Sequence, residues 1–506
     1  MSDRRKRTAR FRRCGVCDRG GGRVGASGGE RKRTLIKLTF SEVVRATEGR
    51  LASPPAPGNV CGVSTDSRTI GAGELFFALS GPNFDGHDFV ADALKRGAAG
   101  AVIASGRRRE VAQRAALNGD AGGKLIEVDD VCAALGKLAA YHRRQMSLNV
   151  IAVVGSNGKT TTKEMIAHVL GGKHRGKASP KSYNNAVGVP LTLLTAEGAD
   201  DFLVVEIGTN APGEVAQLAA LARPNMAVVT CIAEEHLEGL GDLEGVVSEE
   251  LSVLDHLGAG GFAAVNIDAP LTRDRLPSEG PTLATFGRCD EADLRVTSAV
   301  FRDPWLTFRI NGRFEYRMRL PGTHNALNAA GAVAIARRLG LAHEEIASSL
   351  ESFVPPPMRT QVQRFGGVTL INDAYNANPQ SALAAIDALE SMPADGRRIA
   401  VFGEMRELGS HAEMLHAAVA ERLRSGQVSH VLLVGAAVRY MEAPLRQKAD
   451  LFAPSVSCCD GVDAASETLA ELVRDGDVVL LKASRAVGLE AVVEPLRRRL
   501  AAAPVS

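Results

Sequence analysis

A glycine-rich stretch in the first half of the chain carries the residues best suited to chemistry. An apolar run, residues 150–154, is followed by Gly155 and Gly158, and Lys159 and Thr160 then open a predicted helix. This order aims free backbone N–H groups, the helix dipole and a lysine charge at one anion, and it offers a hydroxyl to Mg2+. The spacing GxxGK[ST] is shorter than the full phosphate-loop pattern, because a valine stands where the first glycine would fall. We expect a nucleotide phosphate site, with an ordinary glycine turn as the alternative.

Charged and amide side chains follow the neighbouring apolar runs. Glu206 ends the buried run at residues 203–207, where a carboxylate can hold Mg2+, although a capping or salt-bridged acid would look the same. His236 follows the next strand, so it is predicted at the same sheet edge, with a structural histidine as the alternative. Asn184 and Asn185 can reach that edge too, or form an ordinary turn.

Three further groups lie in the second half of the chain. Asn325 and Asn328 are spaced i, i+3 at a helix start, so they share one face and can read a purine edge or cap the helix. Residues 372–379 place four amide or carboxylate groups after a strand, and residues 482–485 repeat that pattern after the last strand. A cleft lined by these groups would bring a nucleotide, a carboxylate and an amine together.

The elements that must position these groups are those of an α/β protein. Apolar strands alternate with helices, which predicts mostly parallel sheets with ligands at the carboxyl ends of the strands. We expect a disordered basic tail (1–33), a small α/β domain (34–146), a phosphate-loop domain (147–352) and a third α/β domain (353–506) that begins at the Pro-rich boundary 354–359. Predicted strands are 60–68, 74–79, 101–104, 150–154, 202–207, 226–230, 261–266, 368–372, 399–402, 431–434 and 478–481; residues 285–320 read as a β-meander and 325–339 as a helix.

Composition narrows the class of protein. The chain of 506 residues is 45% hydrophobic and 23% charged, with no apolar run long enough to cross a bilayer. Twelve Lys/Arg and three Asp/Glu fall in residues 1–33, which leaves a net charge of −7 on the body and no reason to expect nucleic-acid binding. The eight scattered cysteines indicate reduced, mostly buried thiols, and Cys14 and Cys17 alone are weak evidence for zinc. We expect a cytoplasmic monomer.

Together the motifs resemble one family, the Mur ligases, which are ATP-dependent amide-forming enzymes of peptidoglycan precursor synthesis. The resemblance covers nearly the whole chain from about residue 35 and rests on residues 66–68, 73–81, 85–87, 155–160, 184–185, 206–210, 236–239, 324–328 and 482–485. Within the family, residues 372–379 and 403–409 are similar to the branch that adds D-alanyl-D-alanine. The Asp-Asn-Pro-Arg stretch typical of the diaminopimelate-adding branch does not occur in this sequence.

The resemblance implies a three-domain architecture, with a central P-loop parallel-sheet domain and a Rossmann-like C-terminal domain. It also implies a reaction: ATP phosphorylates the carboxylate of UDP-N-acetylmuramoyl-tripeptide, and the amine of D-Ala-D-Ala attacks the acyl phosphate. ATP and Mg2+ are the implied cofactors, and closure of the third domain would exclude water.

The family's roles carry over residue by residue as expectations. The ATP site would comprise Gly155, Ser156, Asn157, Gly158, Lys159, Thr160, Thr161, Asn325, Asn328, Arg359 and Asp373. Thr160, Glu206 and His236 would hold metal, and Lys159 would neutralise the transferring phosphoryl group. Asp66, Ser67 and Arg68 would receive the UDP moiety, while Asn184, Asn185, Asn376, Asn378, Ser484 and Arg485 would meet the remaining substrate groups.

One departure from the family pattern concerns the metals. The family carries a carbamylated lysine downstream of the histidine, whereas residues 245–253 of this chain contain no lysine and Glu250 falls at or next to that place. A carbamylated lysine is a long side chain that ends in a carboxylate, and a glutamate is a shorter one. We hypothesise that Glu250, with Glu249 as the alternative, serves as the catalytic metal-side carboxylate.

Three rival functions stay open at this point. One is a Mur-type or folylpolyglutamate-type ligase that adds a different amine, which residues 66–68 and 375–379 argue against. Another is a P-loop ATPase that makes no amide, and its ATP hydrolysis would be independent of both substrates. The last is a non-catalytic scaffold, disfavoured by the presence of Lys159, Glu206 and His236 together.

Overall fold

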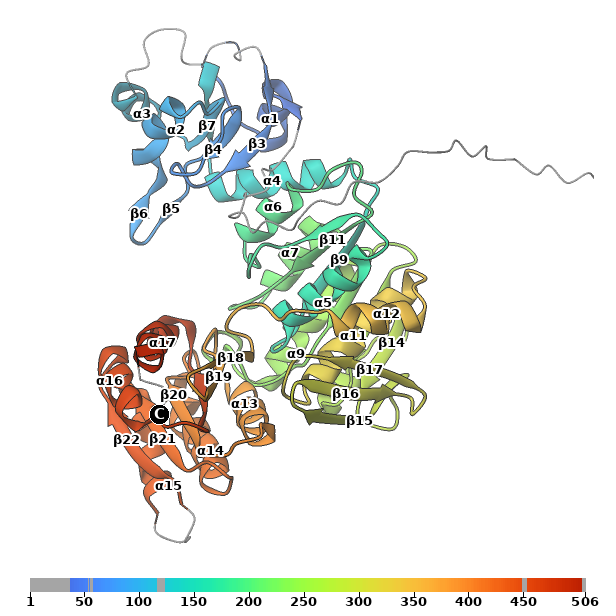
Figure 1. Cartoon of the computed structure of the whole chain (residues 1–506). Coiled ribbons are helices and arrows are strands. Elements are labelled where there is room, and N and C mark those ends of the chain that lie inside the picture. The colour runs from blue at the N-terminus through green and yellow to red at the C-terminus, as the bar shows by residue number, and fades with distance from the viewer. Residues whose placement is uncertain (1–36, 53, 55–57, 116–122, 448–452, 503–506) are drawn as a thin grey trace, which may run out of the picture. The chain divides into compact units, whose positions relative to one another are not determined.

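A computed structural model describes residues 37–52, 54, 58–115, 123–447 and 453–502 (Figure 1). The predicted basic tail, with Cys14 and Cys17, lies outside these described residues. The sheets fall in three consecutive stretches of the chain, each of them built mainly from parallel strands.

The first sheet has the strand order β3-β4-β7-β8, all parallel: β3 (Gly62–Ser64), β4 (Glu74–Phe77), β7 (Gly100–Ala104) and β8 (Leu125–Val128). The helix α1 (Phe40–Thr47) precedes this sheet, and Thr39 and Glu42 cap it reciprocally. The strand expected over residues 60–68 ends at Ser64, so that prediction was too long. The chain turns there because Asp66 accepts the N–H of Arg68 at 3.0 Å.

The second sheet has nine strands in the order β10-β11-β9-β12-β13-β14-β15-β16-β17. Its parallel part holds β10 (Gly176–Ala178), β11 (Phe202–Glu206), β9 (Asn149–Val154), β12 (Met226–Val229), β13 (Phe262–Asn266) and β14 (Thr282–Gly287). The four strands predicted here are confirmed, with ends shifted by one residue at most. Because β9 lies between β11 and β12, the turns after these three strands meet at one sheet edge.

The expected meander and helix follow the parallel strands. β15 (Leu294–Arg302), β16 (Trp305–Ile310) and β17 (Phe314–Met318) pair antiparallel, and α11 (Asn325–Arg338) comes next. α11 packs along α5 (Lys159–Gly171), the helix that opens at the glycine-rich turn. Met165, Ile166, Val169 and Leu170 are fully buried, so α5 presents the apolar face expected of it.

The third sheet has the order β18-β19-β23-β20-β21-β22: β18 (Gln361–Phe365), β19 (Val368–Asp373), β23 (Val478–Lys482), β20 (Arg398–Gly403), β21 (His430–Val434) and β22 (Ser455–Cys459). β18 is antiparallel to β19 and the other pairs are parallel. The four predicted strands are confirmed, whereas β18 and β22 were not predicted. Both are edge strands with alternating polar residues and therefore lack the apolar run of a buried parallel strand.

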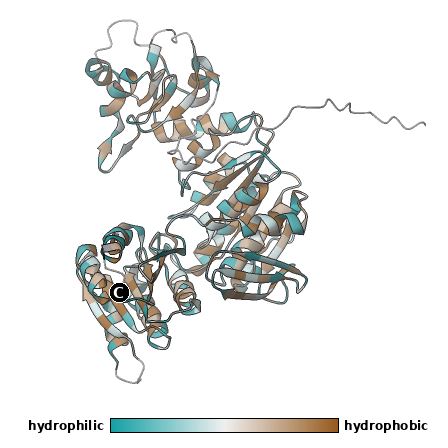
Figure 2. Cartoon of the chain, viewed as in Figure 1, coloured by the Kyte–Doolittle hydropathy of each residue, from teal (hydrophilic) through white to brown (hydrophobic). Residues whose placement is uncertain are grey.

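Figure 2 shows the apolar colouring concentrated on strands and inward helix faces. The inner strands β9, β11, β12 and β13 are buried along almost their whole length. The six described cysteines are free thiols, but Cys459 alone among them is buried, so the expectation of mostly buried thiols was wrong. Among the described helices, none combines the length and apolar character required to span a bilayer.

Candidate active site

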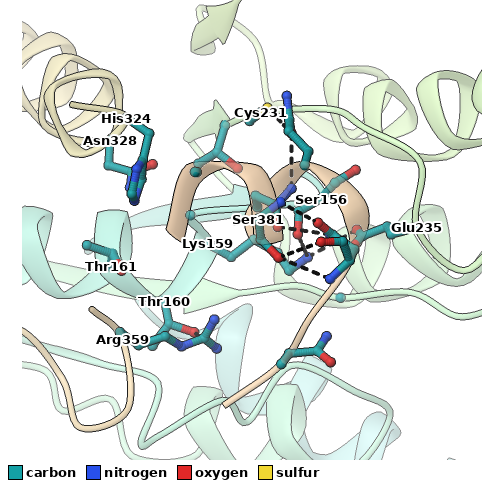
Figure 3. Close-up of a pocket in the computed structure, with 18 of the residues that line it drawn as sticks. Ser156, Lys159, Thr160, Thr161, Cys231, Glu235, His324, Asn328, Arg359 and Ser381 are labelled. Carbon is teal, nitrogen blue, oxygen red and sulfur yellow. Dashed lines mark hydrogen bonds and ion pairs between the residues drawn. The ribbon is translucent and has the colours of Figure 1, made fainter. Parts of the chain in front are cut away.

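A cavity of about 590 Å3 opens over the glycine-rich turn (Figure 3). This volume is in the range of small-molecule sites. Most predicted site residues line it: Ser156, Asn157, Gly158, Lys159, Thr160, Thr161, Asn184, Asn185, Glu206, His236, Asn325, Asn328, Arg359, Asp373, Asn376 and Asn378. The lining thus combines the turns after β9, β11 and β12 with residues beyond 353.

Both glycines of the turn are required by close contacts. Gly155 has φ +117°, and a Cβ there would lie 2.3 Å from Thr230 Oγ1. Gly158 has φ +86°, and a Cβ there would lie 2.1 Å from Asn328 Oδ1. The backbone therefore approaches its neighbours, and any anion above them, more closely than a residue with a side chain would allow.

Lys159 is the main positive charge of the turn. Its Nζ donates to the carbonyl oxygens of Gly155 and Ser156, the second at 3.2 Å, and lies 3.5 Å from Glu235 Oε1. Burial acts to lower the pKa of Lys159, but the carboxylates of Glu235, Glu250 and Glu206 outweigh it and raise that pKa above its ordinary value. Lys159 therefore stays charged and ready for an anion.

Glu250 lies under the turn. It is fully buried, its Oε2 accepts the Gly155 N–H at 2.7 Å, and its Oε1 is buried without a hydrogen-bond partner. Burial raises the pKa of Glu250. Glu250 is not among the cavity-lining residues, so its metal-side role stays a prediction.

The alternative, Glu249, is engaged elsewhere. Its carboxylate accepts the N–H groups of Gly213 and Val215, both at 2.7 Å, at the start of α7 (Glu214–Ala222). Thr209 donates to it as well, at 3.1 Å. These three bonds account for the burial of Glu249 as a cap of α7.

Glu206 reaches the cavity from the end of β11. Asn184 donates to its Oε1 at 3.1 Å, and Lys163 Nζ lies 3.5 Å from its Oε2, which has no hydrogen-bond partner. Lys163 is itself fully buried and donates to the Ser179 carbonyl at 2.8 Å. Asn185, in contrast, accepts the N–H groups of Val187 and Gly188 and so shapes the turn into α6 (Gly188–Leu193).

His236 precedes the short helix α8 (Leu237–Leu240) with φ +51°. Its Nδ1 lies 2.5 Å from Glu407 Oε2, without the alignment of a regular hydrogen bond, and its Nε2 lies 3.9 Å from Glu235 Oε2. Burial and then the charge of Lys159 lower the pKa of His236 despite Glu407. A neutral imidazole has a nitrogen lone pair that can bind a metal, and the metal role expected for His236 stays a prediction.

The third sheet supplies a second group of cavity residues. Arg359 donates to Thr160 Oγ1 at 3.1 Å, and its guanidinium lies 3.9 Å from the centre of the Tyr375 ring. Asp373 accepts from Lys482 Nζ at 2.6 Å and from the Thr360 N–H at 2.8 Å. The Arg359–Thr160 contact joins residues 199 positions apart in sequence.

The amides divide into two pairs. Asn328 donates to Asn325 Oδ1 at 2.9 Å, which confirms that they share a face, and Asn325 donates to the Pro321 carbonyl at 2.8 Å. Asn378 donates to Asn157 Oδ1 at 2.9 Å and accepts from the Ser381 N–H at 2.8 Å, as the cap of α13 (Pro379–Ser391). Asn376 lines the cavity beside it.

Some predicted residues lie outside the cavity lining. Ser67 is buried, and Arg68 is exposed and pairs with Asp66 at 2.9 Å. Ser484 accepts the Arg406 N–H at 2.9 Å, and Arg485 is paired with Glu490. The substrate-binding roles expected for these five residues stay predictions.

Several cavity residues had no individual role predicted from the sequence, although residues 482–485 were expected to line the cleft. Glu235 is buried, and burial raises its pKa to about 7, with Glu250 adding to that effect and Lys159 opposing it. Lys482 and Gln380 line the cavity too, and Gln380 accepts from the Cys231 thiol at 2.9 Å and from Asn157 at 3.1 Å. Burial raises the pKa of Cys231 to about 11. The polar run at residues 231–236 was the available signal for Glu235, but it did not separate Glu235 from the exposed Glu234.

The cavity wall contains oxygen atoms that could bind a divalent cation. Within the described part of the chain, no three histidine, cysteine or acidic side chains gather as a closed metal cluster. Two buried carboxylate oxygens in the cavity wall, Glu206 Oε2 and Glu235 Oε1, nevertheless lack a hydrogen-bond partner. This set suits Mg2+, which is commonly held by one or two carboxylates together with substrate phosphates.

Family models match most of the chain. Residues 59–143 match the Mur ligase family catalytic domain, residues 153–336 the Mur ligase middle domain, and residues 358–485 the Mur ligase glutamate ligase domain. The chain is 32% identical over 468 residues to the UDP-N-acetylmuramoyl-tripeptide–D-alanyl-D-alanine ligase of Bacillus subtilis, covering 91% of this chain and 99% of that one. It is 33% identical over 407 residues to the Escherichia coli protein of the same name, covering 79% and 86%.

Solved structures agree with these matches. MurF from Acinetobacter baumannii superposes with a TM-score of 0.80 at 26% identity, covering 92% of this chain and all of that one. MurF ligase from Thermotoga maritima, solved in complex with ADP, gives 0.73 at 28% identity, covering 87% and 97%. The three-domain α/β architecture with parallel sheets is thus that of these relatives, and the chain belongs to the Mur ligase family.

Proposed function

We propose that the chain is an ATP-dependent ligase that joins D-Ala-D-Ala to UDP-N-acetylmuramoyl-tripeptide. One observation carries the proposal: a single cavity combines the phosphate loop of the second sheet with Arg359, Asn376 and Asn378 of the third. The B. subtilis and E. coli relatives bear the name of this activity. We also propose a cytoplasmic enzyme that acts as a monomer, with the domain boundaries 146/147 and 352/353.

The proposed reaction begins with transfer of the γ-phosphoryl group of ATP to the free carboxylate of the tripeptide. The terminal P–O bond of ATP breaks, ADP leaves, and an acyl phosphate forms. Lys159, released from its loop carbonyls, and the loop N–H groups stabilise charge on the transferring oxygens. Arg359, next to Thr160, adds a second positive charge.

The amine of D-Ala-D-Ala then attacks the acyl carbon. The tetrahedral intermediate expels inorganic phosphate, the amine loses a proton to solvent, and the amide remains. Asn376 and Asn378 are proposed to orient the dipeptide, with Ser484 and Arg485 nearby in sequence for the acyl phosphate. Asp66, Ser67 and Arg68 are proposed to bind the UDP moiety.

The nucleotide itself is proposed to lie between the loop and the buried amides. Asn325 and Asn328 would face the adenine, and Asp373 would face the ribose. Burial lowers the pKa of the adjacent His324 to about 4, so this imidazole is neutral at pH 7. Thr160, Glu206 and His236 are the proposed ligands of Mg2+, which would offset the negative charge of the phosphates when bound.

Product analysis tests the proposed function. We expect phosphate release to require both UDP-N-acetylmuramoyl-tripeptide and D-Ala-D-Ala, and mass spectrometry to find the UDP-linked pentapeptide. ATP hydrolysis that is indifferent to both substrates would instead identify an ATPase. A product containing a different amino acid would identify another Mur-type ligase.

Glu250 can be tested by Glu250→Gln, which preserves size and an acceptor for the Gly155 N–H but removes the charge. If the carboxylate acts on the metal side, we expect turnover to fall about tenfold or more and the Mg2+ requirement to rise. Added bicarbonate should leave the activity of the unsubstituted enzyme unchanged, since the chain has no lysine to carbamylate at this place. Unchanged turnover and Mg2+ dependence in the variant would contradict a metal-side role and leave Glu250 only its hydrogen bond to the glycine-rich turn.

A further inference from the structure

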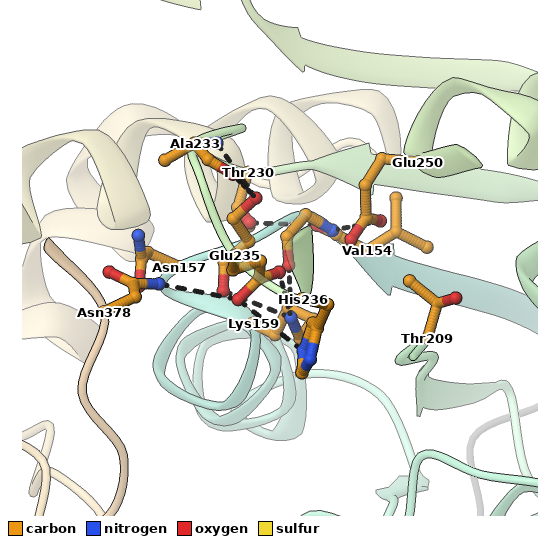
Figure 4. A network of polar contacts seen from close by, with 12 residues as sticks. Val154, Asn157, Lys159, Thr209, Thr230, Ala233, Glu235, His236, Glu250 and Asn378 are labelled. Carbon is orange, nitrogen blue, oxygen red and sulfur yellow. Dashed lines mark hydrogen bonds and ion pairs between the residues drawn. The ribbon is translucent and has the colours of Figure 1, made fainter. Parts of the chain in front are cut away.

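Glu235 is a buried carboxylate in the cavity wall that the proposed mechanism does not yet use. Its side chain is 6% exposed, and its Oε1 has no hydrogen-bond partner. Asn378 donates to its Oε2 at 3.5 Å, and Lys159 and His236 lie beside the carboxylate (Figure 4). The preceding residue, Glu234, is exposed. The chain therefore turns one of two adjacent carboxylates into the cavity and leaves the other in solvent.

Lys159 does not fully account for this burial. Its Nζ lies 3.5 Å from Glu235 Oε1 but donates its hydrogen bonds to the Gly155 and Ser156 carbonyls. If Lys159 turns to a nucleotide phosphate, Glu235 is left as a buried anion beside another anion. Such an arrangement is unfavourable unless Glu235 takes up a proton or a cation lies between the two anions.

The geometry next to Glu235 fits such a cation. Its Oε2 lies 3.9 Å from His236 Nε2. Ligand atoms held about 2.1 Å from Mg2+ are about 3.0 Å apart when adjacent and about 4.2 Å apart when opposite. The observed 3.9 Å is about 0.9 Å longer than the adjacent separation, so the flexible Glu235 side chain must move toward His236 for one ion to contact both atoms.

Glu407 prepares the histidine for this role. Its carboxylate lies beside Nδ1, which favours the ring proton on that nitrogen and leaves the Nε2 lone pair directed toward Glu235. The backbone agrees with this placement, because the Glu238 N–H donates to the Glu407 carbonyl at 3.4 Å. A carboxylate behind a metal-binding imidazole is a frequent means of orienting it.

We propose that Glu235 and His236 jointly hold a divalent cation over the phosphate loop, with Glu235 as a carboxylate ligand additional to Glu206. The inference rests on the proposed Mg2+-dependent function. It adds an anionic oxygen at the cavity wall, where Glu235 is part of the lining, and is independent of whether Glu250 reaches the metal from under the loop.

Mn2+ binding to the full chain, measured by electron paramagnetic resonance with saturating ADP, tests the proposal. We expect Glu235→Gln to weaken the Mn2+ site additional to the ion bound by ADP itself by at least about tenfold. Affinity for ADP should change by less than about threefold, because the loop N–H groups are untouched. The matched control is Glu234→Gln, which alters the adjacent exposed residue and should leave Mn2+ binding unchanged.

The outcomes separate this inference from the proposed function. Mn2+ binding that is identical in Glu235→Gln and the unsubstituted protein overturns the inference, as does an unsubstituted protein with no additional Mn2+ site. Neither result affects amide formation, which the product analysis tests independently. If Glu235→Gln does not fold, Glu235→Asp preserves the charge one methylene further back. The Glu235→Asp variant should bind Mn2+ with intermediate affinity. Unchanged affinity in this variant would contradict direct binding of the ion by Glu235.

Discussion

Replacing Lys159 by methionine is expected to lower phosphate release by about 1000-fold or more, because the variant loses the main charge on the transferring phosphoryl group. The methionine preserves the length of the side chain. Lys159 also offsets the carboxylates of Glu235 and Glu250, so its loss should reduce the free energy of unfolding by about 2 kcal/mol as well. Phosphate release under saturating substrates and a thermal melt measure the two effects.

A double variant separates the two roles of Lys159. Lys159→Met combined with Glu235→Gln removes one of the carboxylates left without a counter-charge, so part of the lost stability should return. Activity should stay at the level of the single variant, because the phosphoryl group still lacks its cation. Recovery of activity together with stability would show that Lys159 acts by holding the loop and not on the phosphoryl group.

Arg359→Ala should lower turnover by about 100-fold to 1000-fold, since a positive charge brought from another domain to a phosphoryl group acts mainly in the transition state. The affinity for ADP should change by less than about threefold, because the loop N–H groups and Lys159 remain. Initial rates and ADP titration measure these quantities. The guanidinium also stacks on Tyr375, so Arg359→Lys should restore the charge but only part of the rate.

Arg364→Ala is the matched control for Arg359. Arg364 lies in β18, five residues further on, and pairs with Asp303 at 2.6 Å, so it too joins the second and third sheets. Its side chain is 51% exposed and is not part of the cavity lining. We expect turnover within about twofold of the unsubstituted enzyme, as for most exposed ion pairs. A large loss in both variants would assign the effect to domain docking.

Most of the buried parallel strands could be predicted from sequence because each is a short continuous apolar run, but the parallel strands β8, β10 and β14 were not predicted. Parallel neighbouring strands end at the same edge of a sheet, so the turns after β9, β11 and β12 were predicted to meet there. This correctly predicted that Lys159, Glu206 and His236 line one cavity. The edge strands β18 and β22 have no such run and escaped prediction. The strand predicted over residues 60–68 was too long, because the residues after Ser64 form a turn that the Asp66 side chain stabilises.

Which of two adjacent carboxylates faces inward could not be predicted. Glu234 and Glu235 lie in an irregular turn without helical or strand periodicity, so nothing in their spacing indicates burial. The same holds for Glu249 and Glu250, which are both buried but serve different elements, a helix start and the glycine turn. Contacts such as Glu407 with His236 depend on docking between sheets and have no local signal at all.

The thiol of Cys231 has a consequence for inhibitor design. Cys231 lines the cavity, where an electrophilic inhibitor could reach its thiol. Burial, however, raises the pKa of this thiol to about 11. At pH 7 roughly one thiol in ten thousand would then be ionised, and the thiolate is the nucleophile. Acrylamide or chloroacetamide compounds directed at this cavity should therefore label Cys231 slowly.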